Sequence, residues 1–490
     1  MTSYLVAFVA GAGVVLAVAL VAATLAMRWW RGWTHRAAMR VHRRYGARID
    51  RFKFVDRDAV VAQLLDDPMI RDAARTHAAA HGGTEAEAMA RARGYLEEMV
   101  PEFSLWLYYK FGLAISEALL RLLFRVEVVD KRPGAVAALP RDAVVIYLMN
   151  HRSNADYVLA GHALAGQVAI SYAVGEWARV FPLEYLFKAF GAYFIRRRFR
   201  ETLYHTVLGR YVQLITRNGV TQGIFPEGGL SRDGRFRPAK IGLLDHILAA
   251  ARAPEVGARV YVVPVAINYD RVLEDRSLLR ELRAEEGHRP PPKVVQFSIV
   301  FWYVAWNALR IVARRWKRHG DAVVVVGEPV PLAPWFDAVR ARRGADFEGL
   351  PRGARLEEVQ RLADDAMRRI GVLMPVPAVP LVCAALQTLD AHYVARERLL
   401  EHVDHLRETL ADGGAELVAP DEPTDALVDR ALALLWIRRA VVRDRGGVAV
   451  LPRGRELVSY YANTIAHLLG DLEPTVRSRD ILPVYEVVDL

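Results

Sequence analysis

The distribution of hydrophobic and polar positions begins with a long apolar run near the N-terminus. Residues 5–27 carry no charged or strongly polar side chain, and Arg28–Trp33 supply basic and aromatic residues directly after them. About 20 apolar residues suffice to cross the hydrocarbon core as a helix, and such flanks suit the membrane interface. A signal peptide would carry its basic residues before the apolar run. We therefore expect a transmembrane anchor at 1–33, with the N-terminus outside and the rest in the cytoplasm.

Residues 34–125 form a second stretch with a helical pattern. Its first part is rich in Ala and Arg, with a break at Gly82–Gly83, and predicts a helical lead-in. Its last part, 103–124, is dense in aromatic and aliphatic residues but also contains charges such as Glu117 and Arg121. A membrane-spanning helix would avoid those charges. We expect a helix that lies in the membrane interface or packs on the core of the protein.

From about residue 126 the pattern changes to short β-branched runs that alternate with helical stretches. Strands are expected at 144–149, 168–174, 193–195, 223–225, 259–267, 294–300 and 322–327. Helices are expected to start near His151 and to cover 241–251. This alternation predicts an α/β domain over 126–372, with a mixed, largely parallel sheet and flanking helices. In such sheets, active sites gather where strands end and helices begin.

The last stretch, 373–490, starts with a proline-rich segment and then favours helices. Its clearest strand candidate is 447–451. We therefore expect a helical C-terminal domain whose function the pattern does not disclose.

The composition narrows the classes of function. The net charge of +10 suits nucleic acid, anionic lipid headgroups or a polyanionic substrate. No nucleic-acid-binding motif is present, so we expect no nucleic-acid partner. The single cysteine, Cys383, lies in an apolar run, which excludes an internal disulfide and a multi-cysteine zinc site and favours a buried, unreactive thiol.

The first candidate for chemistry is the segment 150–156, where a predicted strand ends and a helix begins. This placement predicts His151 at an exposed tip and Asp156 within the first turns, close enough to orient the imidazole as a general base. No serine lies in a nucleophile-elbow sequence, which favours direct attack by a substrate hydroxyl. Taken alone, the spacing is weak evidence, because Ser, Asn and Asp also serve simply as helix caps.

Three further segments carry candidate chemistry. Arginines at 196–198 follow a strand and could bind phosphate, although a solvated basic run facing anionic lipid fits as well. The loop 225–235 combines glycines with two carboxylates, a hydroxyl and arginines, although it could also be a plain turn. Pro264 lies within a predicted strand, where proline alone would suggest an edge or a bulge.

Together, these four segments resemble the conserved blocks of the glycerolipid acyltransferase superfamily: H-x4-D, an arginine block, F-P-E-G and a proline block. Residues 191–197 and 227–235 are most similar to the bacterial membrane-bound glycerol-3-phosphate acyltransferases, which read G-A-x-F-I-R-R and E-G-G-x-S-R-x-G-R there. Residues 451–453 and 460–467 resemble the C-terminal region of the same branch. The resemblance covers roughly 100–470 and implies the glycerolipid acyltransferase fold.

The resemblance also implies roles for single residues. His151 would be the base and Asp156 its orienting partner. The substrate-binding residues would be Arg196, Glu227, Gly228 and Ser231, with Arg152, Arg197 and Arg232 as second candidates, and Pro264 would line the acyl-donor side. The implied reaction transfers an acyl group from coenzyme A or acyl carrier protein to the sn-1 hydroxyl of glycerol 3-phosphate, giving lysophosphatidate. It needs no cofactor and no metal, and it implies membrane lipids as partners at the bacterial inner membrane.

One departure keeps other functions open. Leu230 stands where the family usually has an arginine before the serine, so the acceptor could instead be 1-acylglycerol 3-phosphate or dihydroxyacetone phosphate. A non-catalytic lipid-binding protein on the same fold is a second alternative. Hydrolysis of lipid esters would need a nucleophile or a metal that the sequence does not offer. The remaining candidate histidines, 162, 205, 246 and 467, are expected to be structural.

Overall fold

The computed structural model describes residues 52, 55–102, 113–164, 170–175, 187–188, 191–196, 199–285, 318–390, 393–444 and 446–470. The predicted membrane span at 5–27, the predicted strand at 294–300 and Arg197 lie outside these ranges. Within the ranges, no helix has both the length and the apolar character that crossing a membrane requires.

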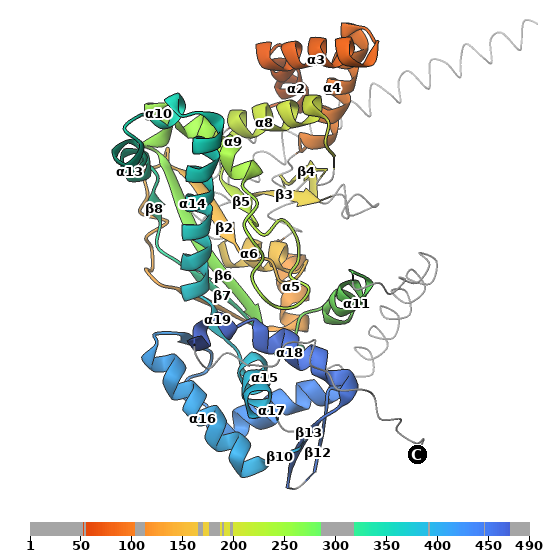
Figure 1. The fold of residues 1–490 in the computed structure, drawn as a ribbon, viewed down its shortest axis with the longest axis vertical. Helices are drawn as coiled ribbons and strands as arrows, with labels where there is room; N and C mark the ends of the chain where they lie inside the picture. Colours follow the sequence, from red (N-terminus) through yellow and green to blue (C-terminus); the bar gives the residue numbers. More distant parts are fainter. Residues whose placement is uncertain are drawn as a thin grey trace, which may run out of the picture.

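The central element is a mixed sheet of eight strands (Figure 1). Its strands are β1 (Arg125–Asp130), β2 (Val144–Met149), β3 (Ser171–Gly175), β4 (Tyr193–Ile195), β5 (Gln222–Ile224), β6 (Val260–Tyr269), β7 (Asp321–Val326) and β8 (Val330–Pro331). The order is β1-β7-β6-β2-β5-β3-β4, with β8 beside β6. Neighbours run parallel except where β6 meets β7 and β8. The predicted α/β fold with a largely parallel sheet is confirmed.

Where both are described, the strands lie within two residues of the predicted bounds, except at the start of β3, and neither β1 nor the two-residue β8 was predicted. β3 begins at Ser171 rather than at residue 168. β1 was not predicted as a strand, because its sequence mixes valines with Arg125, Glu127 and Asp130. It lies at the edge of the sheet and is largely exposed, so a charged strand is tolerated there.

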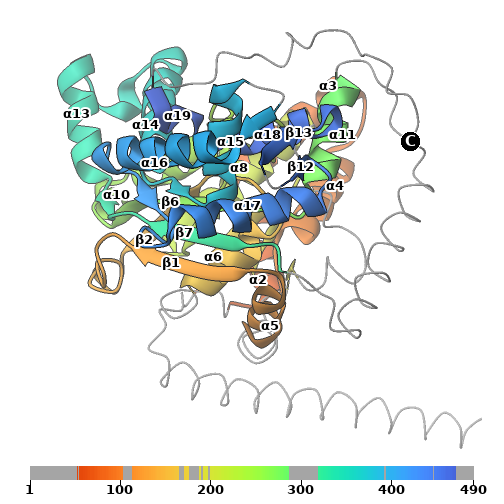
Figure 2. The same cartoon turned by 90° about the horizontal axis from the view of Figure 1, so that it is seen from below.

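Helices cover both faces of the sheet. In Figure 2, the sheet lies between α14 on one side and α6 on the other. One face packs against α8 (Thr202–Arg217), α9 (Gly242–Ala251) and α14 (Arg352–Val372), and the other against α5 (Leu113–Leu123) and α6 (Asp156–Leu164). Side chains alternate along each strand. In β6, Val262 and Ala266 therefore face the first set of helices, while Val263 and Ile267 face the second.

The predicted helical lead-in consists of α2 (Arg57–Leu65), α3 (Pro68–His81) and α4 (Glu85–Met99). α3 ends where predicted, at Gly82, whose φ of 68° glycine adopts without strain. Thr84 then caps α4 in a capping box with Glu87. The lead-in packs on α8 and is joined to it by an ion pair between Arg210 and Asp67 (2.5 Å).

The amphipathic stretch before β1 forms α5 in its described part. Leu120 is buried against the core, while Glu117 and Arg121 pair on the outer side. α5 contacts α6 and β1, so its described part packs on the central sheet.

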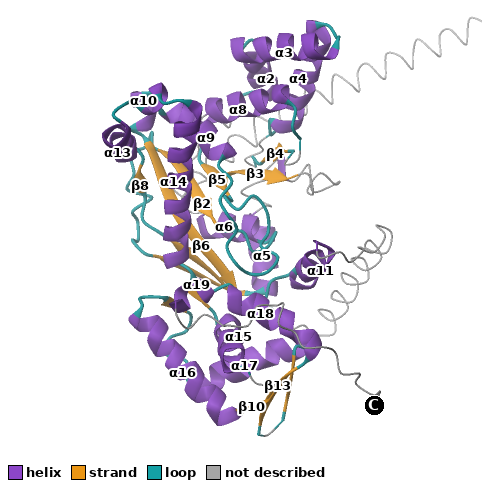
Figure 3. Cartoon of the chain, viewed as in Figure 1, coloured by secondary structure: helices purple, strands orange, loops and turns teal. Residues whose placement is uncertain are grey.

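The C-terminal stretch is helical, as predicted, but contains more strands than expected (Figure 3). Its helices are α15 (Ala378–Leu389), α16 (Arg396–Asp412), α17 (Thr424–Ile437), α18 (Arg455–Asn463) and α19 (Ala466–Leu469). Five strands of two to four residues accompany them: β9 (Pro375–Val376), β10 (Tyr393–Ala395), β11 (Glu416–Leu417), β12 (Val441–Arg443) and β13 (Gly447–Val450). α15 is buried almost throughout, with Cys383 fully buried as predicted. The buried side chains of the C-terminal helices belong to the same hydrophobic cluster as the face of the sheet that packs against α5 and α6.

The other described helices are α10 (Pro254–Gly257), α11 (Asp275–Glu285) and α13 (Ala333–Arg343). Of these, α11 begins six residues after β6 ends, close to the region described next.

Candidate active site

The predicted catalytic segment is a loop between β2 and α6. β2 ends at Met149, but α6 begins only at Asp156, so the predicted helix start near His151 is wrong. Asn150 explains the difference. Its side chain donates to the carbonyl of Ile267 (2.8 Å) and accepts from the amide of the same residue (2.7 Å), which continues the pairing of β2 with β6 by a side chain.

His151 and Asp156 form a buried pair. The Nδ1 of His151 donates to Oδ2 of Asp156 over 2.9 Å. The imidazole stacks on Phe225, with ring centres 4.1 Å apart, and meets the edge of Tyr157. His151 is only 1% exposed, so the predicted exposed tip is wrong: the aromatic side chains enclose the ring. Because Nδ1 carries the proton toward Asp156, the lone pair of Nε2 is available to accept one.

The carboxylate of Asp156 receives four hydrogen bonds in total. Besides His151, the backbone amides of Arg152 (2.7 Å) and Ser153 (3.0 Å) donate to Oδ2, and the hydroxyl of Tyr269 donates to Oδ1 (2.5 Å). These donors compensate the burial of the charge and fix the carboxylate in place. Burial and the negative charge of Asp156 raise the pKa of Tyr269 well above its usual value, so Tyr269 remains a neutral donor.

Tyr269 is a site residue that the sequence analysis missed. It ends β6, whose alternating side chains place it on the same face as Val265 and Ile267. An available signal was its position at the carboxyl end of a predicted strand, where site residues gather.

Glu227 holds the catalytic loop from the other side. One carboxylate oxygen accepts from the amide of His151 (2.9 Å) and the other from the amide of Arg237 (3.0 Å). Burial raises the pKa of Glu227, while the positive charge of Arg152 and these two amides oppose the rise. With both oxygens bound to backbone, Glu227 braces His151 in this structure rather than facing a substrate.

Arg152 and Ser231 are also engaged within the protein. Arg152 is fully buried, donates from Nη1 to the carbonyl of Gly234 (2.6 Å), and lies 5.1 Å from the ring centre of Phe236. The hydroxyl of Ser231 donates to the carbonyl of Arg235 (2.6 Å). The Arg152 side chain therefore fastens the loop 227–237 to the segment 150–156, while the Ser231 hydroxyl holds the loop together internally.

Two glycines allow this loop its close approaches. Gly228 has a φ of 65°, and a Cβ there would lie 2.6 Å from Cδ of Lys240. Gly234 has a φ of 85°, and a Cβ there would overlap the carbonyl oxygen of Tyr460 in α18. The C-terminal region thus contacts the loop 227–237 directly.

Arg196 lies at the same level of the sheet as His151, but three strands away. The register across β5 and β3 places Leu148 of β2 level with Tyr193 of β4. His151 lies three residues after Leu148, and Arg196 lies three residues after Tyr193. Three strand spacings correspond to roughly 14 Å, which a small phosphorylated alcohol and a long arginine side chain can bridge.

The guanidinium of Arg196 is partly occupied. It forms a bidentate ion pair with Glu98 of α4 (3.0 and 2.6 Å) and lies over the ring of Phe199. Its side chain is still 28% exposed, so a ligand can reach it.

The other two described candidates lie apart from the His151–Asp156 pair. Arg232 pairs with Glu281 of α11 (3.1 Å). Pro264 is in the interior of β6, paired with Leu148, and the alternation of the strand places it on the face opposite Tyr269.

Pro264 is therefore neither at an edge nor in a bulge, as proline alone would suggest. Its carbonyl accepts from Gly327, directly after β7 ends. The amide and carbonyl of one strand residue point to the same side of the strand. The N–H that proline lacks would therefore point to the gap between the end of β7 and the start of β8, where no strand residue needs it as a donor.

Leu230 is half-buried against the same apolar cluster as Phe225, and its carbonyl accepts from Nη1 of Arg237 (3.3 Å). His467 contacts the carbonyl of Gly371 through Nε2 (3.1 Å) and packs on Phe236, as expected of a structural histidine. In the described part of the chain, no three His, Cys, Asp or Glu side chains gather closely enough to hold a metal ion.

Two family models match the chain. The acyltransferase model matches residues 135–268, which contain the His151–Asp156 pair and the loop around Glu227. The model of the glycerol-3-phosphate acyltransferase C-terminal region matches 305–471. The resemblance found in the sequence motifs is confirmed for both parts.

Relatives with the name glycerol-3-phosphate acyltransferase align with most of the chain. The proteins from Aeromonas hydrophila and Pseudoalteromonas atlantica are 27% and 28% identical over 433 and 434 residues. The alignments cover 85% of this chain and 51% and 50% of those proteins. The chain thus spans about half the length of the curated relatives it matches.

Among solved structures, the 1-acyl-sn-glycerophosphate acyltransferase from Thermotoga maritima is 19% identical, covering 54% of this chain and 80% of that one. The TM-score of 0.29 is too low to establish that the two share a fold.

Proposed function

We propose that the chain, which matches the acyltransferase model and the model of the glycerol-3-phosphate acyltransferase C-terminal region, transfers an acyl group to the sn-1 hydroxyl of glycerol 3-phosphate. The observation that carries this proposal is the buried His151–Asp156 pair at the carboxyl end of β2. The product would be lysophosphatidate, the precursor for a second acylation.

The chemistry follows from the geometry of the pair. Nε2 of His151 takes the proton of the acceptor hydroxyl, and the hydroxyl oxygen attacks the thioester carbonyl. Asp156 stabilises the imidazolium that forms and keeps the ring oriented. The tetrahedral intermediate then expels the thiolate, which receives the proton back from His151, so that an ester and a free thiol result.

We assign the acceptor phosphate to Arg196, with Arg197 and Arg232 as further cations. Arg196 is at the level of His151, is partly exposed, and offers a planar guanidinium suited to a phosphate. Glu227 and Ser231 act in this scheme by holding the backbone of His151, to which the amide of Ser231 also donates (3.2 Å).

The donor and the location are further parts of the proposal. A thioester of coenzyme A or acyl carrier protein supplies the acyl group, and no cofactor is required. The apolar run 5–27 and its basic flank support attachment to a bacterial inner membrane with the catalytic domain in the cytoplasm.

The test is an assay of membranes containing the full chain with a labelled acyl thioester and each of three acceptors: glycerol 3-phosphate, 1-acylglycerol 3-phosphate and dihydroxyacetone phosphate. We expect labelled lysophosphatidate from glycerol 3-phosphate. Activity with 1-acylglycerol 3-phosphate alone would instead assign the apolar side chain of Leu230 to a lipid acceptor.

His151→Ala is the matching variant, and its transfer rate should fall at least about a thousandfold, because the general base is lost. His205→Ala is the control. His205 is exposed on α8 and hydrogen-bonds through Nε2 to the carbonyl of Phe199 (2.9 Å), so wild-type activity is expected. Unchanged transfer in His151→Ala would refute the proposed mechanism.

A further inference from the structure

The seven residues from Tyr269 to Asp275, here called the bridge segment, connect β6 to α11. They lie between the catalytic loop 150–156 and the C-terminal region, and their side chains bind to both. The sequence motifs assign no role to this segment.

Toward the catalytic loop, the segment offers two side chains. Tyr269 donates to Oδ1 of Asp156 (2.5 Å). The carboxylate of Glu274 accepts from the hydroxyl of Ser153 (2.7 Å) and from the amide of Asn154 (3.1 Å). Burial raises the pKa of Glu274, and these two donors oppose the rise. Glu274 thus holds the turn between His151 and Asp156, and Tyr269 holds Asp156 itself.

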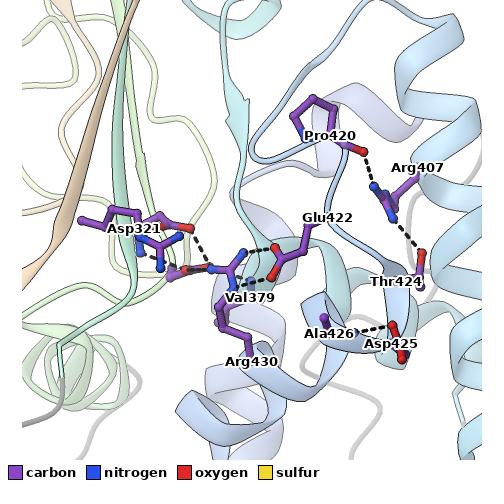
Figure 4. A network of polar contacts seen from close by, with 11 residues as sticks. Asp321, Val379, Arg407, Pro420, Glu422, Thr424, Asp425, Ala426 and Arg430 are labelled. Carbon is purple, nitrogen blue, oxygen red and sulfur yellow. Dashed lines mark hydrogen bonds and ion pairs between the residues drawn. The ribbon is translucent and has the colours of Figure 1, made fainter.

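Toward the C-terminal region, Asp270 is fully buried and accepts from the amides of Val379 (2.9 Å) and Asp321 (2.9 Å). Arg430 of α17 reaches Asp270 (3.0 Å) and Asp321 (2.7 Å) with Nη1. Figure 4 shows Arg430 between Asp321 on the sheet side and Glu422 on the side of the C-terminal helices.

Tyr461 of α18 is the second attachment. Its hydroxyl accepts from the amide of Val272 (3.1 Å) and donates to Oδ2 of Asp275 (3.0 Å). Arg438 donates to the same oxygen from Nε (2.9 Å). Tyr461 is 1% exposed, so removal of its hydroxyl would leave a buried backbone amide without this partner.

We propose that Tyr461 is a positioning residue for acyl transfer, which acts through the bridge segment on the His151–Asp156 loop. The connection is short. Tyr461 binds Asp275, and Asp275 directly follows Glu274, whose carboxylate accepts hydrogen bonds from Ser153 and Asn154. A shift of about 1 Å at reacting groups is enough to slow catalysis strongly. The inference deepens the proposed function, since it assumes that His151 transfers acyl groups.

Tyr393 supplies a control. It lies on β10 of the C-terminal region, and its hydroxyl donates to Oδ1 of Asp444 (3.1 Å). Tyr393→Phe and Tyr461→Phe therefore each remove a hydroxyl and its hydrogen bonding from the C-terminal region, but only the second removes bonds to the bridge segment.

The experiment compares the two variants, each prepared as the 490-residue chain in membranes. For Tyr461→Phe we expect a fall in kcat of about tenfold or more, with KM for glycerol 3-phosphate within about twofold of wild type. Tyr393→Phe should keep the wild-type kcat. Equal kcat values for the two variants, or a change in KM alone, would overturn the inference.

Hydrogen exchange in the peptide covering 150–156 gives a readout that does not depend on activity or on the acceptor. Tyr461→Phe should exchange faster there, and Tyr393→Phe should match wild type. If wild type acylates none of the three acceptors, the proposed function fails while the exchange result still decides the coupling. Unchanged exchange in Tyr461→Phe would overturn the coupling even if all variants were active.

Glu274→Gln and Glu274→Ala form a second pair, in case Tyr461→Phe does not fold. Glutamine keeps an acceptor oxygen for the loop, whereas alanine keeps none. We expect kcat to fall further in Glu274→Ala than in Glu274→Gln, and equal, wild-type values in both would again overturn the inference.

Discussion

At the scale of single residues, the environment of Asp156 explains how a histidine and an aspartate five positions apart act together. The carboxylate is fully buried, and its four donors leave it no freedom to turn away from His151. The backbone of His151 is held separately by Glu227. The pair is therefore rigid before any substrate binds, which is what a general base requires.

Asp156→Asn tests this rigidity. An asparagine cannot accept all four hydrogen bonds, and its amide nitrogen would face a donor, so the imidazole loses its orienting partner. We expect kcat to fall by a factor on the order of 10² to 10⁴ with little change in KM. Tyr269→Phe, which removes one donor only, should cost less, about tenfold. Steady-state kinetics with labelled thioester measure both, and a smaller effect for Asp156→Asn than for Tyr269→Phe would contradict this account.

Arg196 and its partner Glu98 give a test with opposite directions. Arg196→Lys loses bidentate contact with phosphate, and KM for glycerol 3-phosphate should rise about tenfold, equivalent to about 1.4 kcal/mol. Glu98→Gln weakens the ion pair that now occupies the guanidinium, so KM should stay level or fall. A rise of KM in both variants would show that the ion pair, rather than a free guanidinium, is needed.

At the scale of elements, the loop 227–237 is held against α18 where Gly234 meets the carbonyl of Tyr460. This contact joins the catalytic α/β domain to the C-terminal region at the active site. It requires both a φ of 85° and the absence of a Cβ, two demands that glycine alone meets.

Gly234→Ala should therefore lower the melting temperature and the activity together. Gly134→Ala is the matched control, since Gly134 has nearly the same φ, 81°, but nothing within 4 Å of its would-be Cβ. Backbone strain alone costs about 1 kcal/mol in both variants, and the overlap adds to it only at Gly234. Thermal unfolding in detergent checks the difference, and equal losses in the two variants would exclude a close contact with Tyr460.

At the scale of the whole molecule, the C-terminal region is built into the same hydrophobic core as one face of the sheet. The network of Arg430 with Asp270, Asp321 and Glu422 lies at this junction. Burial and the nearby charge of Asp321 raise the pKa of Asp270 to about 6, although Arg430 opposes the rise.

This raised pKa predicts a pH dependence of stability. An unfolded aspartate loses its proton near pH 4, whereas Asp270 in the folded chain keeps it up to about pH 6. Between these values the folded state binds more protons, so stability falls as the pH rises, in total by on the order of 3 kcal/mol. Asp270→Asn lacks this contribution.

The free energy of unfolding of wild type should therefore exceed that of Asp270→Asn by the largest amount near pH 4. This excess of wild type over the variant should decline toward pH 7. Urea unfolding followed by tryptophan fluorescence at several pH values measures the difference. A difference that grows in favour of wild type as the pH rises would contradict the predicted sign.

The sequence alone determined the α/β class and most strand positions, and it singled out the pair that we propose to be catalytic. Strand runs such as 144–149 are apolar throughout because both faces of a central parallel strand are buried, and this pattern is local. The pair of His151 and Asp156 was recognisable because its two members are close in the chain and accompanied by the family's other motifs. The α/β class and the resemblance to the family follow from such local signals.

Only the tertiary structure decided which residues hold that pair. Tyr269 is 113 positions from Asp156, Glu274 is 121 from Ser153, and Tyr461 is 186 from Asp275. The order of the strands brings β6 beside β2, and the packing of α18 brings Tyr461 to the bridge segment. Local patterns do not encode such neighbours, because hydrogen bonds across a sheet or between packed layers depend on the topology of the whole chain. For the same reason, the burial of His151 and the bracing roles of Glu227 and Ser231 became visible only in the folded molecule.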